Sequence, residues 1–155
     1  MERMILTSDA FYDGTKIPEK YASTKKGQNY SPPLNWTNAP SGTVSFSIIA
    51  EDVSIPFIGK ITHWVIYNIP GAYFGLRENP PDTKFIDGII QGKNIYFKNA
   101  YLGPDPISGS HEYIFTIYAL DCMIDKKNAT AKALLKLMEN HILDSAKLSG
   151  FYSKK

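Results

Sequence analysis

Four polar side chains in this sequence have types and positions that suit a small binding site. They are Asp52, His63, His111 and Tyr113. A carboxylate, two imidazoles and a phenol can hold a small anion through hydrogen bonds, and such groups can also act as acid, base or metal ligand. Because the four residues are far apart in the sequence, a shared site depends on how the elements around them pair.

Two β-strands are expected to carry Asp52 and His63. Alternating apolar residues predict a strand over residues 43–52 that ends at Asp52, and a second strand over 61–69 with His63 near its start. The first strand is expected to turn Val44, Phe46, Ile48 and Ala50 to one face and Ser45 and Ser47 to the other. The second is expected to carry Ile61, His63, Val65, Tyr67 and Ile69 on one face. If the strands are antiparallel neighbours, Asp52 and His63 meet at one sheet edge.

A third strand is expected to bring His111 and Tyr113 to the same edge. Residues 113–120 are apolar on both faces, which is typical of a central strand covered on each side. His111 and Tyr113 stand at positions i and i+2, so they share a face. The loop from Gly103 to Gly109 precedes them, and its glycines could let backbone N–H groups approach a ligand. A small polar pocket lined by the four side chains is therefore the main functional hypothesis.

The rest of the chain predicts a mainly β protein. Residues 71–99 form a long irregular excursion with a strand-like piece at 85–86, and residues 129–142 have helical spacing after Asn128, a suitable N-cap. A helical turn over 144–148 that ends at Gly150 is also expected. We predict a single domain over residues 1–155, an antiparallel β-sandwich of Greek-key type with one C-terminal α-helix and a long irregular loop.

Composition excludes several classes of function. The 155 residues carry 17 Lys and Arg against 15 Asp and Glu, a net charge of +2, which does not support nucleic-acid binding. No apolar run is long enough to span a membrane. The one cysteine, Cys122, excludes an intrachain disulfide and a four-thiolate zinc site, and it fits a reducing, cytoplasmic location. His141, placed on the expected helix, is interpreted as a structural or surface residue.

Two enzymatic alternatives use the same residues. Asp52, His63 and His111 have the composition of a 2-His-1-carboxylate iron site or of a partial zinc site. A hydrolase would need a nucleophile beside a histidine, but Ser108 and Ser110 flank a glycine without the Gly-x-Ser-x-Gly elbow and fit an ordinary turn. We expect a binding protein with no catalytic residue, no metal and no cofactor.

Motifs along almost the whole chain resemble those of the phosphatidylethanolamine-binding protein family, in its bacterial and archaeal Raf-kinase-inhibitor-like branch. The matching residues are Phe11, Gly14, Ile17-Pro18, Tyr21, Asn29, Ser31 to Leu34, Trp36, Glu51-Asp52, Pro56, His63 to Val65, Asn68 to Pro70, Gln91 to Asn94, Tyr101, Gly103-Pro104, Pro106, Gly109, His111, Tyr113 and Tyr118 to Asp121. Agreement in this order over such a length is more specific than any one short motif.

The resemblance implies a β-sandwich with a small cavity that accepts phosphate, phosphorylated head groups or other small anions. It implies the ligand-binding residues Asp52, Pro56, His63, Gly103, Pro104, His111 and Tyr113. It also implies inhibition of a partner such as a protein kinase or a serine protease, and a homodimer as one assembly state. The family's acidic motif has Pro and Asp where this chain has Val53 and Ser54, and its loop has Pro where this chain has Ile107. The peptide before Pro56 is typically cis in the family, and the resemblance leaves both isomers open here.

Overall fold

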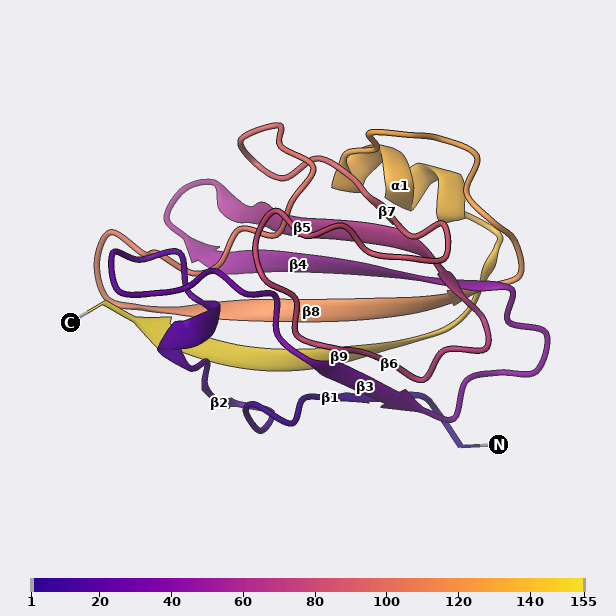
Figure 1. Ribbon diagram of the computed structural model, residues 1–155, viewed down its shortest axis with the longest axis horizontal. Helices are drawn as coiled ribbons and strands as arrows, with labels where there is room; N and C mark the ends of the chain where they lie inside the picture. Colours follow the sequence, from indigo (N-terminus) through magenta and orange to yellow (C-terminus); the bar gives the residue numbers. More distant parts are fainter. Residues whose placement is uncertain (1, 155) are drawn as a thin grey trace.

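A computed structural model describes residues 2–154 and contains two β-sheets packed face to face (Figure 1). The larger sheet has the order β2 (Thr15–Lys16), β9 (Ile142–Ser153), β8 (Ser110–Leu120), β4 (Ser45–Ile55), β5 (Gly59–Pro70) and β7 (Ile90–Gln91). The smaller has the order β1 (Ile5–Thr7), β3 (Leu34–Thr37) and β6 (Gly75–Leu76), and a 3-10 helix covers Glu19–Tyr21. The predicted β-sandwich is confirmed, with the parallel pair β2 and β9 as an exception to its antiparallel pairing.

The strands that carry the candidate residues pair as expected. β4 and β5 are antiparallel neighbours, and β8 lies on the other side of β4, between β4 and β9. The chain therefore leaves β5 and returns across the sheet to enter β8, which is the Greek-key type of connection. The central position predicted for residues 113–120 is confirmed.

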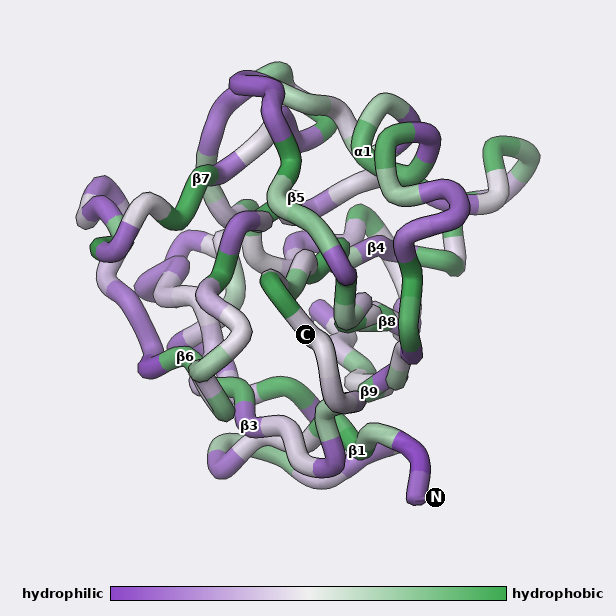
Figure 2. The backbone as a smooth tube through the Cα atoms, turned by 90° about the vertical axis from the view of Figure 1, so that its right-hand side faces the viewer, coloured by the Kyte–Doolittle hydropathy of each residue, from purple (hydrophilic) through white to green (hydrophobic). Residues whose placement is uncertain are grey.

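Both faces of the large sheet are covered. The smaller sheet packs on one face, where Trp36, Phe46 and Ile48 belong to one core, and α1 (Ala131–Met138) packs on the other, where Ile49 and Leu134 belong to a second. Viewed end-on, α1 and the strands β1 and β3 lie on opposite sides of the large sheet (Figure 2). The alternation expected for β4 is confirmed, since Phe46, Ile48 and Ala50 share one core and Ile49 lies in the other, and both faces of the strand are covered. Ser45 and Ser47 are fully buried, and Val44, 44 % exposed, precedes the strand.

The side chains expected on one face of β5 do not all share a face, because this strand contains two β-bulges. These side chains are Ile61, His63, Val65, Tyr67 and Ile69. The pairing passes from Phe46 opposite Ile69 to Ile48 opposite Ile66, and from Ala50 opposite Trp64 to Glu51 opposite Thr62. Each step inserts one extra residue in β5, which moves the following side chains to the other face. Val65 and Tyr67 pack in the core beneath α1, whereas Ile69 packs between the sheets. Asn68, at φ 58°, supports its bulge by bonding the Ile124 backbone through both amide atoms.

The C-terminal region differs from the sequence prediction. The helix is shorter than 129–142 and begins after Thr130, whose side chain accepts a hydrogen bond from the Ala133 amide, so Asn128 is not the cap. Residues 144–148 belong to β9, because this segment pairs with β8 along its whole length. Gly150 lies inside that strand, where a Cβ atom would come within 2.5 Å of Cγ1 of Ile17. Close packing, and not a helix C-cap, requires this glycine.

The long excursion over residues 71–99 is irregular, as predicted, apart from β6 and β7. The strand-like piece at 85–86 is not a strand. The ring of Phe85 packs on Trp64 of β5, with 6.2 Å between the ring centroids. Within residues 2–154, no helix has the length and apolar character needed to cross a membrane.

Candidate functional site

A cavity of about 780 Å³ opens at the end of the large sheet where β4 meets β5 and β8 begins. In Figure 1 this end of the sheet lies at the left. Its lining comprises Ser23, Asp52, Ser54, Ile55, Pro56, Ile61, His63, Ile95, Tyr96, Leu102, Gly103, Asp105, Pro106, Ile107, Ser108, Ser110, His111 and Tyr113. A neighbouring hollow of about 290 Å³ shares Tyr96 and Leu102 with it but contains no histidine. The larger cavity therefore holds the four polar residues singled out from the sequence.

The buried Asp52 and the largely buried His111 form a pair in the lining of this cavity. Nδ1 of His111 lies 2.7 Å from Oδ2 of Asp52, and the amide of Ser54 donates to Oδ1 at 2.9 Å. Asp52 is only 2 % exposed, so these two hydrogen bonds replace water around its carboxylate. A carboxylate can only accept, so His111 donates its Nδ1 proton to Asp52. When His111 is neutral, its Nε2 atom therefore carries a free lone pair.

His63 reaches the cavity because of the bulge between Trp64 and Thr62. In a regular strand it would share the face of Val65 beneath α1, but here its ring packs edge-on against Tyr113, 5.2 Å between centroids. Its Nδ1 atom lies 2.7 Å from the carbonyl oxygen of Leu102, so Nδ1 is the donor. Burial lowers the pKa of His63, although the Leu102 carbonyl and Asp52 act in the opposite direction. His63 is thus held neutral, again with Nε2 as an acceptor.

Tyr113 places a buried hydroxyl group in the lining without a hydrogen-bond partner among residues 2–154. Burial raises the pKa of this tyrosine, and the nearby negative charge of Asp52 raises it further. The hydroxyl is therefore protonated, lies close to the Asp52 carboxylate, and can donate to that carboxylate or to a ligand. An unpartnered buried polar group costs about 1–3 kcal/mol, which a ligand or a water molecule that bonds it would offset.

The loop residues implied by the resemblance have different positions. Pro56 and Gly103 line the cavity, whereas Pro104 is not in the lining and its carbonyl accepts from the Ser23 amide. The Gly103 amide donates to Asn29 at 2.7 Å and is not free for a ligand. A Cβ atom on Gly103 would come within 2.1 Å of the Tyr21 carbonyl oxygen, so close packing explains this glycine. The bond before Pro56 is trans, since residues 2–154 contain no cis peptide.

Sequence reasoning missed several lining residues. Ser23, Ile95, Tyr96 and Asp105 come from irregular segments, where no periodicity indicates which side chain faces the cavity. Ser54, which stands where the family has Asp, accepts a hydrogen bond from the Glu112 amide and joins the end of β4 to β8. The structure offers no account of Val53.

The geometry does not favour the enzymatic alternatives. Asp52, His63 and His111 do not bring three ligand atoms within 4.8 Å of one another, and within residues 2–154 only Asp121, Cys122 and His141 do so. Nδ1 of His111 is hydrogen-bonded to Asp52, and Nδ1 of His63 is hydrogen-bonded to the Leu102 carbonyl, so only Nε2 of each imidazole is left to bind a metal ion.

Comparisons with known proteins agree with this architecture. The family model described as phosphatidylethanolamine-binding protein matches residues 7–153. The chain belongs to this family. A UPF0098 protein of Methanothermobacter thermautotrophicus is 43 % identical to this family member over 154 residues, which cover 97 % of this chain and 99 % of that one.

Two solved structures of related proteins share the fold of this phosphatidylethanolamine-binding protein family member. A putative phosphatidylethanolamine-binding protein homologue from Chlamydia trachomatis superposes with a TM-score of 0.90 at 34 % identity, covering all of both chains. YbcL of E. coli, described as a new member of the mammalian family, gives a TM-score of 0.88 at 25 % identity and covers 99 % of this chain and all of that one. The family suggested by the sequence motifs is therefore confirmed.

Proposed function

We propose that the cavity binds a small anion, namely the phosphate of a phosphorylated side chain or of a phospholipid head group, and that binding lets the protein inhibit a partner such as a kinase or a serine protease. The observation that carries this proposal is the unpartnered Tyr113 hydroxyl, buried in the lining beside two imidazoles. A phosphate oxygen can accept from this hydroxyl and so remove the cost of leaving it unbonded.

Proton uptake accompanies binding in this proposal. The lining contains no Lys or Arg among the described residues, and both Nε2 atoms are acceptors while the imidazoles are neutral. Phosphate oxygens need donors, so either an imidazole takes up a proton or a protonated phosphate donates its own. Because either route adds a proton to the complex, and the second pKa of phosphate is about 6, affinity rises as the pH falls from about 8 to 6.

An apolar rim around the cavity supports a protein partner. Phe57 and Ile58 form the exposed tip of the β4–β5 turn, and the lining residues Tyr96 and Ile107 are also largely exposed. Phe57 is fully exposed at φ 66°, a conformation that bulky residues rarely adopt. Apolar side chains in such positions are typical of a contact surface, so the rim fits apolar residues beside a phosphorylated side chain. We propose that this interaction takes place in the cytoplasm. The alternative partner for the apolar rim is a second copy of the chain.

Titration calorimetry tests the anion site. Phosphate, phosphoethanolamine and acetate are titrated into wild type, His111→Ala and His141→Ala, each shown to be folded and freed of metal with a chelator. His141 lies outside the cavity and provides the matched control. We expect saturable binding of both phosphorylated ligands by wild type and His141→Ala, and at least a tenfold loss in His111→Ala. Folded wild type that binds neither phosphorylated ligand would refute the anion site, and an affinity that stays constant between pH 8 and 6 would refute the donor role of the imidazoles.

A further inference from the structure

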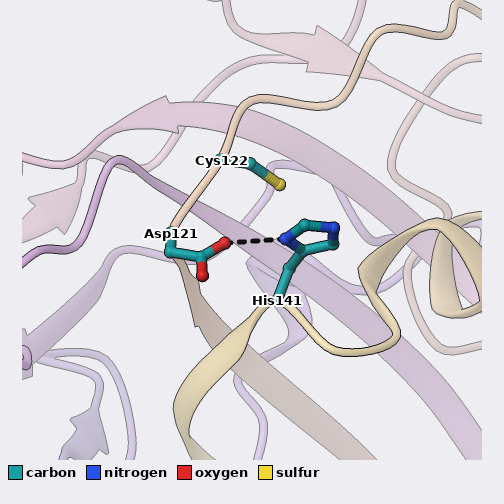
Figure 3. Close-up of side chains that lie close together, drawn as sticks. All are labelled: Asp121, Cys122 and His141. Carbon is teal, nitrogen blue, oxygen red and sulfur yellow. Dashed lines mark hydrogen bonds and ion pairs between the residues drawn. The ribbon is translucent and has the colours of Figure 1, made fainter.

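A second cluster of reactive side chains lies at the opposite end of the large sheet from the cavity. Asp121 and Cys122 directly follow β8, and His141 directly precedes β9, so the pairing of these two strands brings them together. Figure 3 shows the three side chains converging on one small region. The cluster includes His141, which is interpreted from the sequence as a structural or surface residue on the expected helix. It lies beyond the end of α1, and its side chain is 45 % exposed.

The three side chains present one sulfur, one nitrogen and one oxygen atom to the same space. Nδ1 of His141 lies 2.8 Å from Oδ1 of Asp121, and the ligand atoms of all three residues lie within 4.8 Å of one another. Tetrahedral ligands bound at about 2.0–2.3 Å from a metal ion lie roughly 3.3–3.8 Å apart. Small side-chain rotations are therefore enough to reach metal-binding distances.

Backbone hydrogen bonds hold the residues of this cluster in place. The Asp121 amide donates to the His141 carbonyl at 3.0 Å, and the Ser45 hydroxyl donates to the Cys122 carbonyl at 2.6 Å. Ser45 is fully buried at the start of β4, so this contact fixes Cys122 to the core of the large sheet. A site whose ligands are already positioned loses less conformational entropy when an ion binds.

We propose that Cys122, His141 and Asp121 bind a divalent transition-metal ion of the zinc type, with a solvent molecule as the fourth ligand. The set of thiolate, imidazole and carboxylate suits Zn²⁺ and excludes the hard cations Mg²⁺ and Ca²⁺, which prefer oxygen ligands alone. The ion would take the place of the proton between His141 and Asp121. Because the side chains of both residues are 45 % exposed, the ion can enter and retain a water molecule.

A reactive thiol is the competing interpretation of this cluster. Burial raises the pKa of Cys122, and the negative charge of Asp121 adds to this effect. Nucleophilic and redox-sensing cysteines instead have lowered pKa values in electropositive surroundings.

Titration with Co²⁺ tests the site without any assumption about activity. Cys122 is the only cysteine of the chain, so a thiolate-to-cobalt charge-transfer band can come only from this residue. We expect one Co²⁺ per chain, an intense thiolate band with visible bands typical of tetrahedral cobalt, and displacement of both by one equivalent of Zn²⁺. If no thiolate band appears at saturating Co²⁺, the proposal is refuted. This includes the case in which Co²⁺ binds at His63 and His111 instead.

Two ligand variants and one control test the site. Cys122→Ser should abolish the thiolate band, and His141→Gln should weaken Zn²⁺ binding at least tenfold. Asp125→Asn, which removes an exposed carboxylate close by in the sequence without removing a ligand, should bind like wild type. A thiolate band with unchanged affinity in His141→Gln would overturn the three-residue site. If Cys122→Ser fails to fold, the titration of wild type still decides whether the thiol binds metal.

Discussion

Nδ1 of His111 lies 2.7 Å from Oδ2 of Asp52, and this contact joins the end of β4 to the start of β8 inside the cavity. It fixes the orientation of the imidazole and directs the second nitrogen away from the carboxylate. The anion-binding proposal rests on this arrangement, because the atom left for a ligand is Nε2.

Asp52→Asn should lower the free energy of unfolding by about 1.5–3 kcal/mol, because charged groups make the stronger hydrogen bonds and the His111 partner is nearly buried. Urea denaturation measures this change. Asp105→Asn is the matched control, since its carboxylate is 42 % exposed in a surface pair with Lys154 and should contribute at most about 1 kcal/mol. Equal losses in the two variants would contradict the assigned importance of the buried pair.

Tyr113→Phe should separate stability from binding. Removal of a buried hydroxyl that has no partner should leave stability unchanged or raise it by about 1 kcal/mol. The same change should weaken phosphate binding about three- to tenfold, since it removes one neutral hydrogen-bond donor. Thermal unfolding and calorimetry provide the two measurements. A less stable variant with unchanged phosphate affinity would show that the hydroxyl has a structural partner and no role in binding.

His63 should make the protein less stable in acid. Its pKa is lower in the folded state than in the unfolded chain, so the unfolded state binds more protons as the pH falls through about 6.5. The stabilising effect of the neutral ring is present above that pH and is lost below it. Relative to His63→Gln, wild type should lose free energy of unfolding between pH 7.5 and 5.5 in phosphate-free buffer. A difference between the two proteins that does not change with pH would contradict this prediction.

Phe57→Asn should stabilise the fold by about 0.5–1 kcal/mol, because asparagine tolerates the positive φ of this turn better than phenylalanine does. Phe57→Ala removes the same ring without this benefit and is the control. Both variants should bind phosphate like wild type in calorimetry, and both should bind a phosphorylated partner protein more weakly. A partner that binds both variants like wild type would contradict the role assigned to the apolar rim.

The sequence by itself determined the strand framework and the main polar residues of the cavity. Alternating side chains located β4 and β5, and the antiparallel pairing of neighbouring strands brought Asp52 and His63 to one edge. These features are local or depend on the pairing of two neighbouring strands, so they can be predicted from the order of residue types along the chain. The family followed from motifs spread along the chain.

Only the tertiary structure decided the features that depend on long-range pairing. The bulge that turns His63 toward Tyr113 arises from the register between β4 and β5, and residues 144–148 become a strand because β8 offers them a partner. The same strand pair brings His141 to Cys122 across a gap in sequence that matches no ligand motif. Local propensity cannot specify such contacts, since hydrogen bonding and packing across the sheet outweigh the preferences of single residues.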